Sequence, residues 1–342
     1  MIFLLISHIF TINRLFNALK IVLFFSSDVV GIVGGQDGNV TLIGLKDDGT
    51  IVANYYHIHE GSITKIRVSP DQEYVATASS DSTVKIWSTA DLSLEKTYIR
   101  HSDTVTSIEF VSVPIQTRSA YTNWFVVSGS MDKTLRLWDI RSMVDLSFDA
   151  DDAIWSLKSF PAANQLAVGF NNGTIGIYVY FYNGFSFVKS LVGHRDVVSD
   201  LAIAGPNTLA SASWDTTIIL WSLTDLIAIQ TLSGHSSKVD ALIFFNTTYL
   251  VSTSNDNSLI VWDTTSANSI GSVTSNVDYI YGAIGAIELL DQNIMVTASN
   301  TTNMLNIWET SQNPELLYSY QIGLPATSLA IVYSKIIQSC LY

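Results

Sequence analysis

The chain is short of cysteine, proline and basic residues, and each shortage excludes a class of protein. Of its 342 residues one is cysteine, Cys340, so no intrachain disulfide or cysteine-based metal site can form. Only 6 prolines and 19 glycines exclude a collagen-like chain. The 17 Lys and Arg are outnumbered by 30 Asp and Glu, a net charge of −13. Because duplex binding relies on cationic contacts to phosphate, we expect no nucleic-acid partner.

The first 25 residues are apolar, but polar residues such as His8, Arg14 and Lys20 interrupt them. A membrane helix needs about 20 mostly apolar residues in a row. A signal peptide carries a positive charge before its apolar run, and residues 1–6 have none. We therefore expect buried strands here, a cytoplasmic protein with the nucleus as the alternative, and no membrane partner. A targeting or membrane-anchoring segment is the other interpretation.

An eleven-residue pattern recurs through the chain. It reads TASSDSTVKIW at 77–87, SGSMDKTLRLW at 128–138, SASWDTTIILW at 211–221 and STSNDNSLIVW at 252–262. Weaker copies complete a set of seven units, which close near Ile43, Trp87, Trp138, Tyr178, Trp221, Trp262 and Trp308. Successive closing residues lie 40 to 51 positions apart. A unit of this length cannot bury its apolar faces alone, so the chain is an array of repeats.

Each unit has room for four short strands. In the unit that closes at Trp262, strands are expected at 238–244, 249–252, 258–262 and 269–273, separated by turn residues. Seven such units predict an all-β fold, a seven-bladed propeller that forms a single domain over residues 1–342. The longest spacing comes from an insertion at 111–123, which we expect to be a loop between the first two strands of its unit.

The end of the chain decides how the ring closes. After Trp308 three more segments have strand character, at 316–321, 327–332 and 335–341. We expect a seven-bladed ring with an overlapping closure, because an open blade edge invites aggregation. The alternative is an eighth, composite blade that residues 1–10 complete.

The repeats resemble those of the WD40 family. Gly193–His194 and Gly234–His235 match its Gly-His signature, and Trp138–Asp139 matches its Trp-Asp signature, as does Trp262–Asp263. The resemblance implies a WD40-type β-propeller and a non-enzymatic scaffold for protein–protein interaction within a multiprotein complex. Two alternatives remain, because the fold hosts many roles. One is a substrate-recognition propeller of a ubiquitin-ligase or splicing-type complex, and the other is a propeller enzyme.

One set of residues has the composition of a hydrolase triad. His194, Ser211 and Asp215 supply a base, a nucleophile and an orienting acid, with Trp221 following. The set recurs at matched offsets as His59, Thr77, Asp81 and Trp87; as His101, Ser128, Asp132 and Trp138; and as His235, Ser252, Asp256 and Trp262. An enzyme needs one nucleophile in one cleft, so four copies indicate a structural role. The resemblance implies a hydrogen-bonded chain in each blade. We expect no catalytic residue, cofactor or metal site.

Three tryptophans fall outside the closing positions, namely Trp124, Trp155 and Trp214. Trp214 immediately precedes Asp215, and Trp155 aligns with the start of an innermost strand. The resemblance places these two on one exposed face, in adjacent blades. Tryptophan anchors many interfaces because it joins a large apolar area to a donor. The predicted protein-binding face comprises Met131, Trp155, Trp214, Lys238, Asp240, Tyr279 and Tyr281. The acidic net charge suits a basic partner. Alternatively, Trp155 only fills space in a blade without its histidine.

Overall fold

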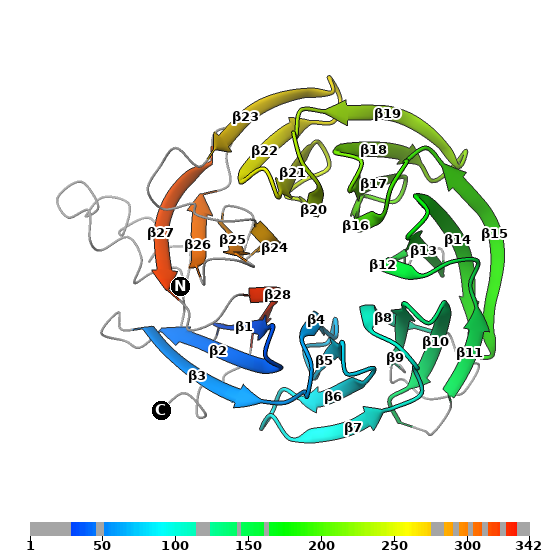
Figure 1. Ribbon diagram of the computed structural model, residues 1–342, viewed down its shortest axis with the longest axis vertical. Helices are drawn as coiled ribbons and strands as arrows, with labels where there is room; N and C mark the ends of the chain where they lie inside the picture. Colours follow the sequence, from blue (N-terminus) through cyan, green and yellow to red (C-terminus); the bar gives the residue numbers. More distant parts are fainter. Residues whose placement is uncertain are drawn as a thin grey trace, which may run out of the picture.

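The computed structural model describes residues 29–45, 51–113, 124–141, 145–160, 164–274, 284–289, 294–299, 304–309, 314–321 and 326–333. Within these residues 28 strands form seven four-stranded antiparallel sheets, which surround a central channel as the blades of a propeller (Figure 1). In blades 2 to 7 the four strands follow chain order, with the first strand innermost and the fourth outermost (Figure 1). The all-β propeller predicted from the repeats is confirmed.

The strand bounds follow blade by blade. Blade 1 contains β28 (Ala326–Tyr333), β1 (Val29–Gly35), β2 (Asn39–Leu45) and β3 (Ile51–His57). Blade 2 contains β4 (Ile63–Val68), β5 (Tyr74–Ser79), β6 (Val84–Ser88) and β7 (Leu94–Tyr98). Blade 3 contains β8 (Val105–Ser112), β9 (Trp124–Ser130), β10 (Thr134–Asp139) and β11 (Asp145–Asp149). Blade 4 contains β12 (Ile154–Phe160), β13 (Gln165–Phe170), β14 (Thr174–Phe181) and β15 (Gly184–Val192). Blade 5 contains β16 (Val198–Ala204), β17 (Thr208–Ser213), β18 (Thr217–Ser222) and β19 (Ile227–Ser233). Blade 6 contains β20 (Val239–Phe244), β21 (Tyr249–Ser254), β22 (Ser258–Asp263) and β23 (Asn268–Thr274). Blade 7 contains β24 (Ile284–Leu289), β25 (Ile294–Ser299), β26 (Met304–Glu309) and β27 (Glu315–Gln321).

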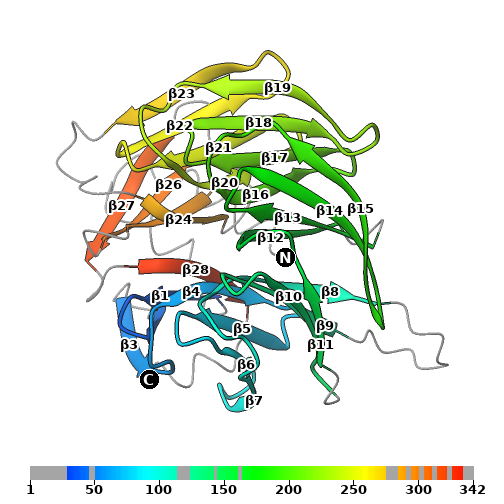
Figure 2. The same ribbon diagram turned by 45° about the vertical axis from the view of Figure 1, so that its right-hand side comes forward.

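The two ends of the described chain meet in blade 1. Strand β28 pairs antiparallel with β1, with Val29 opposite Tyr333, and it lies between β24 and β4 at the channel (Figure 2). The segment expected at 327–332 is therefore the innermost strand of blade 1, not the first strand of an eighth blade. The segments 1–10 and 335–341 lie outside the described residues. The predicted insertion at 111–123 does fall between the first two strands of its blade, β8 and β9.

Apolar residues on both faces of the middle strands hold the blades together. On β9 the consecutive residues Val126 and Val127 are both 0% exposed, because each faces a different neighbouring blade. Outer strands have one solvated face, so Ile227 of β19 is 54% exposed. Sheets that are covered on both faces read as nearly unbroken apolar runs. This burial explains why the repeats are so rich in valine and isoleucine.

A tight turn joins the second and third strands of the blades, and it requires a positive φ. The residue after the turn aspartate has φ between 62° and 75° at Ser82, Lys133, Thr216 and Asn257. Blades 1 and 4 use Gly38 and Gly173 at this position. A Cβ on Gly38 would lie 1.9 Å from the carbonyl oxygen of His59, so glycine is required there. The glycine-rich segment around Gly38 is therefore the turn between β1 and β2.

Ion pairs link the innermost strands across the channel. Lys65 of β4 lies 3.4 Å from Asp200 of β16, three blades away. Glu109 of β8 accepts both Arg67 at 3.5 Å and Lys158 at 3.4 Å. Burial lowers the pKa of Lys65, although the Asp200 carboxylate opposes the shift. These pairs tie blades 2 to 5 together.

Candidate functional site

The His-Ser-Asp-Trp set forms one hydrogen-bonded chain inside blade 5. His194 Nδ1 lies 2.9 Å from Asp215 Oδ2, and His194 Nε2 lies 2.7 Å from Ser211 Oγ. Trp221 Nε1 then donates to the same Ser211 Oγ at 2.8 Å. The sets in blades 2, 3 and 6 have the same connections, with His–Asp distances of 2.8 to 3.0 Å. We call each of these four chains a tetrad.

A hydroxyl that the sequence analysis overlooked completes each tetrad. Thr217 Oγ1 donates to Asp215 Oδ1 at 2.6 Å, and its backbone N–H donates to the same oxygen. The equivalent residues are Thr83, Thr134 and Ser258. The signal was available, because a Ser or Thr stands two positions after the aspartate in all four copies. The aspartate therefore joins the turn to the histidine.

The tetrads have the connections of a hydrolase triad but lack access to a substrate. Ser211, Ser128 and Ser252 are all 0% exposed. Each of these hydroxyls already binds the histidine on one side and the tryptophan indole on the other. A nucleophile must reach a substrate carbonyl beside an oxyanion site. The geometry thus supports the structural interpretation.

Burial and hydrogen bonds shift the pKa values within the tetrads. Burial lowers the pKa of His59, His101 and His235 below the usual value, although the neighbouring aspartates oppose the shift. Burial alone would raise the pKa of Asp132, but hydrogen bonds from Thr134 and the Ser102 N–H lower it to about 2. At neutral pH the folded protein therefore holds His59, His101 and His235 neutral, each beside an ionised aspartate.

We expect the protein to lose stability as the pH falls below about 6.5. There the three histidines bind protons in the unfolded chain while their folded pKa values remain lower, so acid favours unfolding. Asp240, whose pKa is raised in the folded protein, binds one more proton in the folded chain than in the unfolded chain over this range, and so offsets part of the loss. A net loss of roughly 2 kcal/mol between pH 6.5 and 5 should result. Urea unfolding at pH 6.5 and 5 measures it, and an unchanged midpoint would contradict the histidine assignments.

A ladder of stacked side chains crosses blades 4, 5 and 6 at the turn end of the tetrads. The rings of Trp155 and Trp214 meet edge to face, with centroids 4.8 Å apart. Lys238 Nζ lies 3.6 Å from the centroid of the Trp214 ring, and Trp155 Nε1 donates to Asn171 Oδ1 at 3.1 Å. Trp155, Trp214 and Lys238 are half-buried, since each partly covers the next. The expected adjacency is present, but the two tryptophans are less exposed than the sequence suggested.

Asp240 lies two residues after Lys238, in β20, and has an unusual carboxyl group. Its Oδ2 is buried and has no hydrogen-bond partner among the residues that the structure describes. Burial raises the pKa of Asp240 to about 7, although Lys238 opposes the shift. Perturbed groups of this kind concentrate at functional sites. We call Trp155, Trp214, Lys238 and Asp240 the tryptophan face.

The other residues of the predicted face have different outcomes. The Met131 N–H donates to the Thr104 carbonyl, just as the Trp214 N–H donates to Val197. Met131 is therefore the blade 3 counterpart of Trp214, and it lies on the same rim. Tyr279 and Tyr281 lie outside the described residues.

Replacing Asp240 with asparagine should stabilise the fold. An acid with a raised folded pKa costs stability once the pH exceeds its unfolded value, and the full cost is reached above the folded pKa of about 7. We expect a gain of roughly 1–3 kcal/mol at pH 8, falling by about half at pH 5. Chemical unfolding at both pH values measures it. Asp196→Asn, an exposed acid in the adjoining loop, is the control. Equal effects of the two variants would show that burial of the Asp240 carboxylate does not lower the stability of the fold.

The seven blades that the structure describes, closed by a shared first sheet and with tetrads inside four of them, define a β-propeller of the repeat class. The family model described as "WD domain, G-beta repeat" matches residues 49–88, 92–139, 185–222 and 227–263. The chain carries WD40 repeats and folds as a WD40-type β-propeller.

Curated relatives match only part of this chain. The periodic tryptophan protein 2 homolog of Caenorhabditis elegans is 28% identical over 170 residues, which is 49% of this chain and 18% of that protein. The nuclear distribution protein PAC1 of Candida albicans is 33% identical over 124 residues, which is 36% of this chain and 24% of that protein. This chain thus spans less than a quarter of the length of either relative.

Solved structures match more of the chain and show the fold. The structure of U3-55K has a TM-score of 0.68 at 19% identity, covering 79% of this chain and 85% of that one. The RRP9 WD40 repeats give a TM-score of 0.69 at 18% identity, covering 87% and 88%.

Two further kinds of feature are absent from the described residues. No helix there is both long and apolar enough to cross a membrane. Nor does that part of the chain bring three or more His, Cys, Asp or Glu side chains together in a way that could hold a metal ion.

Proposed function

We propose that this protein is a non-enzymatic scaffold that docks a partner polypeptide on the tryptophan face, within a multiprotein complex. The observation that carries the proposal is the ladder of Trp155, Trp214 and Lys238, together with the nearby Asp240 oxygen, which has no hydrogen-bond partner in the part of the chain that the structure describes. Aromatic residues packed at the centre of a rim are the usual anchors of an interface. Carboxyl groups whose pKa is strongly raised by burial concentrate at functional sites.

Charge favours a basic partner segment. The chain has a net charge of −13, and the loops around the tryptophan face contribute the exposed acids Asp103, Asp151 and Asp196. A lysine or arginine on the partner would meet these carboxylates, and the indole rings would accept it by cation–π contact. Lys238 already occupies the face of Trp214, so it would have to move aside.

The tetrads support a role without catalysis. WD40 propellers are generally non-enzymatic. In this chain the Ser or Thr hydroxyls of the four triad-like sets are buried and already hydrogen bonded to the histidines. Their contribution is to hold each blade, and with it the tryptophan face, in a fixed geometry.

For the cellular compartment we propose the nucleus in preference to the cytoplasm. The likeness to a periodic tryptophan protein, U3-55K and RRP9 supports this alternative. Imaging of the tagged full chain tests it, and exclusion of the signal from the nucleus would contradict it.

Affinity purification of the tagged full chain, followed by mass spectrometry, tests the scaffold proposal. We expect protein partners that stay bound at low salt and dissociate as the salt concentration rises, because a basic segment on an acidic rim is screened. Recovery of the chain alone at low salt, together with a hydrolytic activity of the purified protein, would contradict the proposal.

A further inference from the structure

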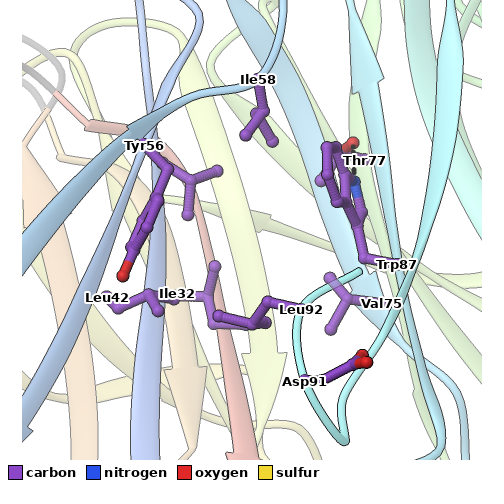
Figure 3. A pocket seen from close by; sticks show the side chains of 10 residues that line it. Ile32, Leu42, Tyr56, Ile58, Val75, Thr77, Trp87, Asp91 and Leu92 are labelled. Atoms are coloured by element: carbon purple, nitrogen blue, oxygen red, sulfur yellow. Dashed lines mark hydrogen bonds between the residues drawn. The ribbon is translucent and has the colours of Figure 1, made fainter. Parts of the chain in front are cut away.

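A cavity of about 210 Å³ lies between blades 1 and 2, away from the tryptophan face on blades 4 to 6. Tyr56 and Trp87 stand on opposite sides of it, and Ile32, Leu42 and Leu92 line the space between them (Figure 3). The carboxylate of Asp91 lies at one end (Figure 3). The lining is therefore apolar with aromatic walls.

The next pair of blades shows what such a position holds. Tyr98 precedes His101 by three residues, and its ring stacks on Trp138 with centroids 4.5 Å apart and an interplanar angle of 27°. Tyr56 precedes His59 by the same three residues and is its counterpart in blade 1. In the blade 1–2 pair, however, the cavity separates Tyr56 from Trp87.

The exposure of the two rings follows from this separation. Trp138, Trp221, Trp262 and Trp308 are at most 2% exposed, whereas Trp87 is only half-buried. Tyr56 is 39% exposed, against 9% for Tyr98. Trp87 still donates to Thr77 Oγ1 at 3.1 Å, so its tetrad is intact. The cavity therefore leaves one face of the Trp87 indole open to a stacking ring, while the hydrogen bond to Thr77 holds the indole in place.

Size and chemistry suit one aromatic ring. An apolar cavity of about 150 Å³ takes up benzene, so 210 Å³ accepts the ring of a phenylalanine or tyrosine. Two flanking rings add stacking energy that an aliphatic group of equal size does not gain. Among the described residues, strand β3, which bears Tyr56, is the outermost strand of its sheet. A polypeptide lying along this edge could pair with its backbone and insert the ring.

We propose that the cavity between Tyr56 and Trp87 is a second binding site, which takes an aromatic side chain of a partner polypeptide. The partner's ring stacks on Trp87 as Tyr98 stacks on Trp138.

Fluorine NMR of the full chain labelled with 5-fluorotryptophan tests the proposal, with the Trp87 signal assigned through Trp87→Phe. The probes are N-acetyl-tyrosinamide, p-cresol and N-acetyl-cyclohexylalaninamide. We expect the capped tyrosine to shift the Trp87 signal saturably and to bind several-fold more tightly than the cyclohexyl probe. Tyr56→Ala should weaken it about tenfold. Tyr182→Ala, which removes a tyrosine that is 63% exposed on blade 4, should change nothing.

Three results would overturn the proposal. Equal binding of the cyclohexyl probe would show a site for apolar bulk and not for a ring. Binding of p-cresol without the capped tyrosine would show a site for free small molecules. Absence of a saturable shift at Trp87, in a labelled protein whose other indole signals are those of the folded state, would show that no ring enters.

Discussion

Replacing Asp215 with alanine is expected to lower the free energy of unfolding by about 3–5 kcal/mol. Asp215 accepts hydrogen bonds from His194 Nδ1, from the Thr217 hydroxyl and from the N–H groups of Arg195 and Thr217. Alanine leaves these donors without an acceptor in a region where the Asp215 side chain is only 11% exposed. Calorimetry should show a fall in Tm on the order of 10 °C.

A matched variant lies in the same blade. Asp225 is exposed, and within the described residues its hydrogen bonds are to nearby Ser222, so Asp225→Ala should change the stability by about 0.5 kcal/mol or less. If Asp215→Ala instead kept its melting temperature and abolished a hydrolytic activity, the tetrad would be catalytic and the structural account would fail.

Removing both indoles with Trp155→Ala and Trp214→Ala should leave the propeller folded and weaken a captured partner about 100-fold or more. Each tryptophan supplies a large anchor area at the centre of the face. Because the rings are in contact, with centroids 4.8 Å apart, the two single changes should not add, and each alone should cost most of the effect. Titration of the purified partner against the four proteins of the cycle measures the coupling.

Trp124→Ala is the control for this pair. Trp124 is another half-buried tryptophan outside the tetrads, and its Nε1 donates to Asp71 across blades 2 and 3. The Trp124→Ala variant should bind the partner with the same affinity as the unchanged protein. Unchanged pull-down partners in the double variant would remove the tryptophan face from the account.

The blades could be predicted from the sequence because their determinants are local and repeated. The pattern SASWDTTIILW contains the second strand, the turn and the third strand of blade 5, and the turn aspartate and the closing tryptophan fix its register. The ring closure could not be decided in this way. It depends on β28 pairing with β1 across almost the whole chain, and neither segment carries a local mark of its partner.

The candidate site likewise has features that the repeats predict and features that they do not. Alignment of the repeats placed Trp155 and Trp214 in adjacent blades, and the structure has them in contact. The position of Lys238 over Trp214 depends on a side-chain conformation that spacing does not encode. The Lys65–Asp200 pair spans the channel between blades that are not neighbours, so no repeat offset points to it. The cavity beside Trp87 exists because Tyr56 does not stack on Trp87 as its counterpart Tyr98 stacks on Trp138, and the spacing of the repeats does not encode this difference.

Site-specific photo-crosslinking in cells tests the docking claim most directly. A photoreactive residue at Arg195, which is exposed in the loop beside Trp214, should crosslink to a partner protein. The same residue at Ile227, which is 54% exposed on the outer strand of the same blade, should give no such product. Crosslinks from position 227 with none from position 195 would contradict the account.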